Sequence, residues 1–177
     1  MPLVRHGAVI DDPFIRVEAD APIPDGAPVL IPAAHFLADA QRLSLRSAPT
    51  GVLWPNDRRV EELAPHLDRL ALVALSFPSF RDGRAYSQAR LLREHYGFRG
   101  ELRATGEVLR DQFLFLLRAG FDSLEVKKIA DASAFDAAVS RYSVFYQPAT
   151  DGRTTAQQAR LRRARWTDAH LSFCCSR

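Results

Sequence analysis

Two arginines and a glycine follow a continuously apolar strand predicted over residues 70–77, at the point where a helix should begin. Free backbone N–H groups at a helix start favour anions, and guanidinium groups hold an oxyanion by paired hydrogen bonds. The segment therefore predicts a site for phosphate, sulfate or sulfite, made of Ser79, Arg81, Gly83 and Arg84. Asp82 leaves a second interpretation open, because a good N-cap residue can occupy the same donors in a structural turn.

A second polar group follows the next predicted strand and comprises Arg103, Thr105, Gly106, Glu107, Arg110, Asp111 and Gln112. Loops after consecutive parallel strands open on the same rim of a sheet, so the two groups are expected to form one anion site. An arginine inside a strand needs a carboxylate or a bound anion, and Glu101 and Glu125 are candidate partners. A structural Arg103–Glu125 ion pair without a ligand is the alternative. Arg110 and Asp111 could equally belong to an exposed helix face.

Neither a metal site nor a cofactor is predicted. The five histidines show no HxH or HxxxH spacing that would gather metal ligands. The chain contains no GxGxxG motif or Walker loop to hold a dinucleotide or nucleotide phosphates. Cys174 and Cys175 are adjacent near the C-terminal end. Because a vicinal disulfide needs an unusual backbone geometry, they are expected to be free thiols, with a redox pair as the alternative.

The elements that must position these residues alternate β with α. Short strands are expected at residues 29–31, 51–54, 70–77, 101–105 and 121–126. Helices are expected at residues 33–45, 83–96, 107–119 and 133–145, with Gly97 and Gly120 as left-handed caps. About five parallel β/α units result, fewer than a complete eight-fold barrel requires. The fold class is therefore α/β, with an open sheet or a partial barrel.

The alternation of polar and apolar residues at positions 101–105 favours a barrel-like sheet with a polar concave interior. An edge strand with one solvated face is the alternative. Residues 1–19 suit a β hairpin that covers the main sheet as a lid. With 177 residues and 47% hydrophobic composition, the chain can bury one core. We expect a single domain over residues 1–150 and a basic, flexible tail over residues 151–177.

Charge and hydropathy limit the partners. No apolar run approaches the roughly 20 residues that span a bilayer, and the first residues lack an apolar signal region, so a cytoplasmic protein without a membrane is expected. The basic run at residues 153–165 lacks interleaved aromatics and the net charge is only +3, which argues against nucleic acid. The apolar residues of segment 108–117 cover most of a helix, which indicates deep burial or a partner interface.

Three stretches, FRDGRAYSQARLLR, GELRATGEVLRDQ and GFD, resemble a small bacterial family of uncharacterised proteins usually described as oxidoreductases involved in sulfite reduction. The family's function was inferred mainly from its association with assimilatory sulfite reductase. The resemblance therefore implies an accessory protein of assimilatory sulfite reduction, which binds an oxyanion or docks on sulfite reductase. The electrons and the siroheme would then belong to the other protein.

Two further functions remain open. One is a stand-alone β/α enzyme that acts on a phosphorylated or sulfonated small molecule. The other is a non-catalytic interaction domain. The sequence does not identify a catalytic residue, and it does not fix the oligomeric state.

Overall fold

A computed structural model describes residues 1–19 and 21–161. Its centre is one sheet with the strand order β2-β1-β8-β7-β6-β5-β4-β3. Strands β3 to β8 are parallel and follow each other in sequence order, while β1 is antiparallel to both of its neighbours. The strands are β1 (Leu3–Arg5), β2 (Ala8–Ile10), β3 (Ile15–Arg16), β4 (Val29–Pro32), β5 (Thr50–Trp54), β6 (Leu72–Phe77), β7 (Glu101–Gly106) and β8 (Ser123–Glu125).

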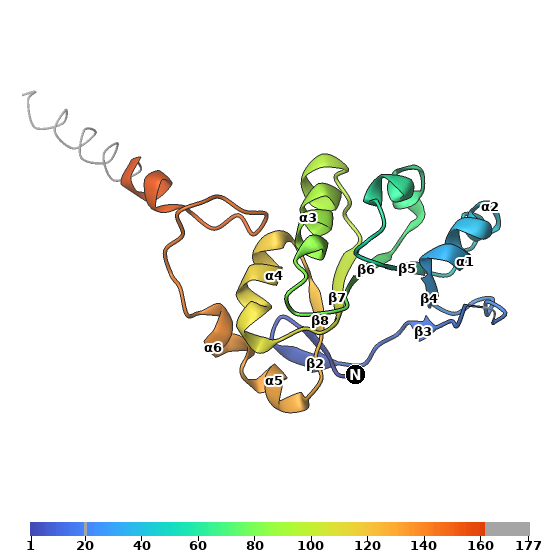
Figure 1. The fold of residues 1–177 in the computed structure, drawn as a ribbon, viewed down its shortest axis with the longest axis horizontal. Coiled ribbons are helices and arrows are strands. Elements are labelled where there is room, and N and C mark those ends of the chain that lie inside the picture. Colours follow the sequence, from blue (N-terminus) through green and yellow to red (C-terminus); the bar gives the residue numbers. More distant parts are fainter. Residues whose placement is uncertain (20, 162–177) are drawn as a thin grey trace, which may run out of the picture.

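The sheet is curled into an open half-barrel, and the connections show why. β2 and β3 are its two edge strands. A flat sheet of this size would hold them about 34 Å apart. Residues 11–14 alone join Ile10 to Ile15, and five Cα steps span at most about 18 Å. The edges must therefore approach each other, and the linking segment crosses beneath the sheet (Figure 1).

The helices that connect the parallel strands lie on the face opposite to this linking segment (Figure 1). They leave the concave face to strand residues and the segment 11–14. Further helices follow β8, and one of them contacts β2. The bounds of the helices are α1 (Ala33–Ala38), α2 (Ala40–Leu43), η1 (Val60–Arg69), α3 (Arg84–Arg90), η2 (Leu91–His95), η3 (Arg110–Gln112), α4 (Phe113–Ala119), α5 (Ile129–Ser133) and α6 (Phe135–Val139).

The main hydrophobic core lies between the convex face of the sheet and these helices. Strand residues that alternate along β6 and β7 contribute to it, including Val73, Leu75, Leu102 and Ala104. A second, smaller apolar cluster on the other face contains Leu30, Leu72 and Ala74. β6 is thus apolar on both faces, as expected for a central parallel strand.

The structure confirms the α/β class and the barrel-like curvature expected from the sequence. It also refines the boundaries. β6 begins at Leu72 rather than at residue 70, and the helical turns after β7 begin at Arg110 rather than at residue 107. In place of the helix expected at residues 133–145, α5 spans Ile129–Ser133 and the short α6 spans Phe135–Val139. Gly97 and Gly120 have positive φ angles of 64° and 103°, as their expected role as caps requires.

The N-terminal hairpin is present, but it does not act as a lid. β1 hydrogen-bonds to β8 and extends the sheet, so that the hairpin supplies two strands of the half-barrel. His6 and Gly7, both with positive φ, form its turn. Most of the expected basic tail, including Cys174 and Cys175, lies outside the described residues.

Candidate functional site

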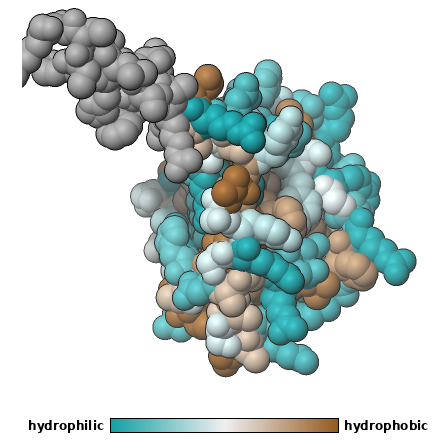
Figure 2. All heavy atoms as spheres, turned by 90° about the vertical axis from the view of Figure 1, so that its left-hand side faces the viewer, coloured by the Kyte–Doolittle hydropathy of each residue, from teal (hydrophilic) through white to brown (hydrophobic). Residues whose placement is uncertain are grey.

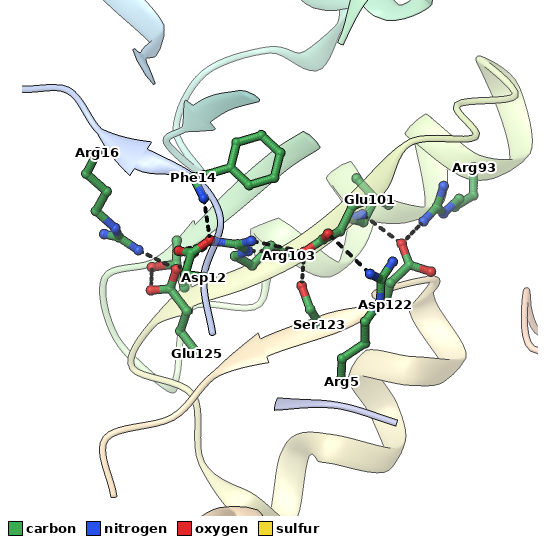
Figure 3. Close-up of polar contacts among 12 residues, drawn as sticks. Arg5, Asp12, Phe14, Arg16, Arg93, Glu101, Arg103, Asp122, Ser123 and Glu125 are labelled. Atoms are coloured by element: carbon green, nitrogen blue, oxygen red, sulfur yellow. Dashed lines mark hydrogen bonds and ion pairs between the residues drawn. The ribbon is translucent and has the colours of Figure 1, made fainter. Parts of the chain in front are cut away.

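The concave face of the half-barrel carries a buried charged cluster centred on Arg103. Side chains alternate along a strand, so Glu101, Arg103 and Thr105 of β7 share one face while Leu102 and Ala104 enter the main core. The side chain of Arg103 is 0% exposed. Figure 3 shows the cluster that surrounds it, which combines residues of β7, β8 and the N-terminal segment.

The guanidinium of Arg103 is bound by three carboxylates. Nη1 donates to Asp12 Oδ2 at 2.7 Å, while Nε and Nη2 both donate to Glu101 Oε1 at 3.2 Å. Glu125 Oε1 lies 3.6 Å from Nη1. The ring of Phe14 covers the guanidinium, with its centroid 5.6 Å from Cζ. The structure thus brings Arg103 to both glutamates named from the sequence and adds Asp12.

The carboxylates have further partners. Thr105 Oγ1 donates to Glu125 Oε2 at 2.7 Å, and Ser123 Oγ donates to Glu101 Oε1 at 2.5 Å. Glu125 also pairs with Arg16 on β3. β3 and β8 are five strands apart in the sheet, a distance of about 24 Å if it were flat. This ion pair therefore identifies the Arg103 face as the inside of the curl.

The positive and negative charges of this cluster are equal in number. Three guanidinium groups face three carboxylates: Arg5, Arg16 and Arg103 with Asp12, Glu101 and Glu125. Arg5 is the loosest member, 3.9 Å from Glu101 and 43% exposed. We name these six residues the concave cluster. Arg103 and Glu125 are buried and Glu101 is largely buried, and burying their charges is tolerable only because each is paired.

Sequence reasoning missed Asp12 and Arg16 of the concave cluster and the Phe14 ring that covers Arg103. Asp12, Phe14 and Arg16 come from a segment that reads as a turn and a short strand. Their role depends on the curl of the sheet, which brings this N-terminal segment into contact with β7 and β8. The residue types at positions 11–13, Asp-Asp-Pro, are typical of a solvent-exposed turn and do not indicate a contact with a buried arginine.

A second ion pair, seen beside the concave cluster in Figure 3, joins two of the sequence stretches quoted above. Arg93 Nη2 donates to Asp122 Oδ2 at 2.5 Å, and the same oxygen accepts from the backbone of Leu102. Arg93 also donates to the carbonyls of Phe98, Gly100 and Gly120. It thereby fixes the end of η2, the cap of α4 and the start of β7.

The loop after β6 carries the first predicted anion group at the rim. Arg84 donates to both carboxylate oxygens of Asp82, at 2.7 Å and 3.0 Å in its shorter contacts. These hydrogen bonds hold the pKa of Asp82 far below its ordinary value. Ser79 Oγ accepts from the backbone N–H of Arg81 at 3.4 Å. The backbone N–H of Arg84 also donates to Asp82 Oδ1 at 3.3 Å, while the N-terminus of α3 at Gly83 has no side-chain cap hydrogen bond.

The rim loops after β6, β7 and β8 are connected through Phe80 and Leu109. The backbone N–H of Phe80 donates to Glu107 Oε2 at 3.3 Å, and its carbonyl accepts from Gln112 Nε2 at 3.1 Å. Gln112 Oε1 in turn accepts from the N–H of Leu109 at 3.1 Å. Lys127 completes the connection by binding Glu107 Oε1 at 3.1 Å. We call these five residues the rim clamp.

The rim clamp presents apolar side chains to solvent. Phe80 is 45% exposed and Leu109 is 38% exposed. The Arg81 guanidinium lies over the Phe80 ring, 5.4 Å from its centroid. Hydrogen bonds from Lys127 and from the Phe80 backbone lower the pKa of Glu107, so its carboxylate is ionised at neutral pH. Arg110 and Asp111 are both exposed in η3, beside Leu109.

Burial raises the pKa of Tyr86 to about 12, with a smaller contribution from Asp111. The phenol therefore stays protonated at neutral pH.

Gly106 has a structural role, because its φ is +98° and an added Cβ would lie 2.4 Å from the carbonyl oxygen of Phe77. At Gly83 an added Cβ would meet only an ordinary contact at 3.7 Å from Tyr86.

The predicted anion residues thus occupy two places. The side chains of Arg103 and Thr105 lie on the concave face. In the sheet register Arg103 pairs with Ala74, which is three residues before the end of β6 at Phe77, so Arg103 lies within the sheet and not at its rim. Arg81 and Arg84 belong to the rim loop beyond that end. The charged contacts of Arg103 and of Arg84 within the described residues involve different carboxylates.

The apolar segment at residues 108–117 is buried only in part. Phe113, Leu114 and Leu116 enter the core, whereas Phe115 is 57% exposed. Figure 2 views the molecule from the side of α4 and α6, and apolar residues there form small groups among hydrophilic ones. Among the described residues, the surface seen in Figure 2 therefore has no broad apolar patch of the kind that marks an extended interface.

Two tests of the described residues concern metals and membranes. No three His, Cys, Asp or Glu side chains within residues 1–19 and 21–161 are grouped to hold a metal ion. None of the helices in that part of the chain combines the length and apolarity needed to cross a membrane.

A family model described as Bacterial protein of unknown function (DUF934) matches residues 51–162. The match includes the rim clamp and the β7 and β8 members of the concave cluster, and it begins after Asp12 and Arg16. No curated protein and no solved structure matches the chain.

Proposed function

We propose a docking function for this chain, which belongs to the DUF934 family of bacterial proteins of unknown function. It acts in the cytoplasm as an accessory protein of assimilatory sulfite reduction and binds sulfite reductase through the rim clamp. The resemblance of residues 80–93 and 100–112 supports the pathway. The electrons and the siroheme belong to the reductase in this proposal.

The exposed ring of Phe80 is the observation that carries the docking proposal. Both backbone polar groups of Phe80 are hydrogen-bonded, to Glu107 and Gln112, while the side chain remains 45% exposed. Binding energy at interfaces is concentrated in a few residues, and aromatic and arginine side chains are enriched among them. An aromatic side chain on an already fixed loop loses little conformational freedom on binding.

The neighbours of Phe80 indicate the chemistry of the partner surface. Leu109 extends the apolar area, and Arg81 and Arg110 place two exposed guanidinium groups at its margin. An apolar depression with acidic residues around it would complement this arrangement. The proposed contact surface on sulfite reductase therefore has a hydrophobic centre and a negative margin.

Binding can be measured between purified sulfite reductase and rim variants of this chain. Phe80→Ala should weaken the complex about ten-fold or more. Arg81→Glu should also weaken the complex, and its effect should be larger at low ionic strength than at high ionic strength. Phe115→Ala is the matched control, because Phe115 is an exposed aromatic residue on α4 whose side chain takes no part in the hydrogen bonds of the clamp. Equal effects of Phe80→Ala and Phe115→Ala would reject the rim as the docking surface.

A growth test addresses the pathway. A strain without this chain, and without a redundant copy, should grow poorly on sulfate and normally on cysteine. The wild-type chain should restore growth on sulfate, and Phe80→Ala should restore it less well than Phe115→Ala. Normal growth of the deletion strain on sulfate would reject the pathway assignment.

A further inference from the structure

We propose that the concave cluster is a binding site for a small, singly charged oxyanion, and that the Asp12 carboxylate occupies this site as an internal ligand. The ligand class is that of formate, acetate or hydrogen sulfite. The site is separate from the rim clamp and does not depend on docking. Four features of the concave cluster lead to this inference.

The guanidinium of Arg103 is held by the sheet itself. Nε and Nη2 both donate to Glu101, which is on the same strand. Glu125 of the adjacent strand lies 3.6 Å from Nη1. Ser123 fixes Glu101 and Thr105 fixes Glu125 by further hydrogen bonds. Removal of the N-terminal segment would therefore leave the orientation of Arg103 defined.

Asp12 differs from the other two carboxylates in where it comes from. It makes the shortest contact to Arg103, at 2.7 Å, yet it belongs to the segment between β2 and β3. Asp11 and Pro13 on either side are exposed, and the Asp12 side chain itself is 28% exposed. The carboxylate with the best geometry is thus the one that can move away without breaking the sheet.

The charges define what could replace Asp12. Three guanidinium groups balance three carboxylates in the concave cluster. When Asp12 withdraws, three guanidinium groups face two carboxylates, and the concave cluster carries a net charge of +1 around the buried Arg103. A single negative charge restores the balance, whereas a doubly charged anion would add an excess next to Glu101 and Glu125.

Geometry points to the same ligand class. The position that Asp12 vacates is that of a carboxylate oxygen pair, one oxygen on Arg103 Nη1 and the other on the backbone N–H of Phe14. A small oxyanion can reproduce the contact to Nη1. Because Phe14 is part of the same segment and covers the guanidinium, its ring moves with Asp12 and controls access. The competition of an attached carboxylate makes the wild-type site weak.

Calorimetry and thermal unfolding with formate test this proposal. Asp12→Ala should bind sodium formate at least ten-fold more tightly than the wild-type chain does. Formate should also raise its melting temperature above the value in sodium chloride of equal ionic strength. Asp11→Ala is the matched control, since it removes a neighbouring exposed carboxylate, and it should behave like the wild type.

Asp12→Asn provides a second variant that keeps the size of the side chain if Asp12→Ala does not fold. It should likewise gain formate binding, and the added change Arg103→Met should abolish that gain. Sulfate, as a doubly charged anion, should bind less tightly than formate. The proposal is overturned if neither Asp12 variant binds formate better than Asp11→Ala at millimolar concentration.

The outcome can be separated from that of the docking proposal. Phe80→Ala should leave formate binding by Asp12→Ala unchanged, because the rim clamp shares no contact described above with Asp12. If the wild-type chain does not bind reductase while Asp12→Ala binds formate, docking alone is rejected. Retained docking without formate binding would reject the anion site alone.

Discussion

Arg103 on the concave face and Arg81 on the rim show how differently one residue type is used in this half-barrel. Arg103 is completely buried and bound to three carboxylates, so its charge is compensated inside the fold. Arg81 is exposed, and its guanidinium lies over an exposed aromatic ring. The first arrangement fixes a structure, and the second leaves a cation at the surface, where another molecule can reach it.

The hydrogen bonds of the two regions also differ, since those of the concave cluster join side chains and those of the rim clamp mostly join side chains to the backbone. In the concave cluster, side chains bind side chains across strands, as Thr105 does to Glu125. In the rim clamp, side chains bind the backbone of Phe80 and Leu109, so that loops are fixed while their apolar side chains face outward. The comparison predicts large stability effects inside and small ones at the rim, where binding should be affected instead.

The largest difference is expected between Arg103→Met and Arg81→Met. Loss of Arg103 leaves Glu101 and Glu125 without their central cation, and breaking a buried pair in this way costs about 3–5 kcal/mol. Arg81→Met should change stability by about 0.5 kcal/mol or less. Urea unfolding followed by circular dichroism measures both. Similar costs for the two variants would remove the distinction between the regions.

A smaller difference should separate Thr105→Val from Ser79→Ala. Thr105 is 6% exposed, and its hydroxyl is a buried donor to Glu125 at 2.7 Å. Without it a buried carboxylate oxygen loses its partner, at a cost of about 1–3 kcal/mol. The longer Ser79 contact, at 3.4 Å on the rim, should contribute far less. The same unfolding assay tests this, and a larger loss for Ser79→Ala would contradict it.

Gln112→Ala should loosen the rim clamp without unfolding the protein. It removes two hydrogen bonds at 3.1 Å, and on a partly exposed loop the net cost in stability should be about 0.5–1.5 kcal/mol. The specific sign is faster hydrogen exchange of the Leu109 amide, whose acceptor is lost. Arg110→Ala, at the neighbouring exposed position, should leave that amide protected. Unchanged exchange in Gln112→Ala would show that the clamp does not order the loop.

The sequence predicted those parts of the molecule that depend on local pattern. Apolar periodicity located β6 and β7, and glycine at positions 97 and 120 located the helix caps. The alternation along β7 indicated a polar concave face, because opposite sides of one strand must meet different surroundings. Glu101, two residues from Arg103 on β7, and Glu125, a single acid between apolar neighbours on the next strand, were recognisable as partners of Arg103 because a buried arginine needs a carboxylate.

The remainder depended on contacts between distant parts of the chain. Asp12 is separated from Arg103 by 91 positions, and only the short connection between the edge strands brings the two together. The rim clamp depends on the backbone of Phe80, which side-chain patterns do not report. The expectation that Arg84 and Arg103 share one site considered the ends of the strands but not the direction of each side chain.

The smallest expected effect is a pH dependence that belongs to the rim alone. The Lys127 and Phe80 hydrogen bonds lower the pKa of Glu107 from its ordinary 4.5, so this carboxylate contributes stability above pH 4.5. That contribution is lost as the pH falls through the lowered folded-state pKa.

The Phe80 amide shift, followed by NMR, should therefore titrate below pH 4.5. Glu107→Gln should remove the titration, and Lys127→Ala should move it toward 4.5. A Phe80 amide that titrates above pH 4.5 in the wild type would contradict the proposed clamp, because its acceptor would then be favoured in the protonated form.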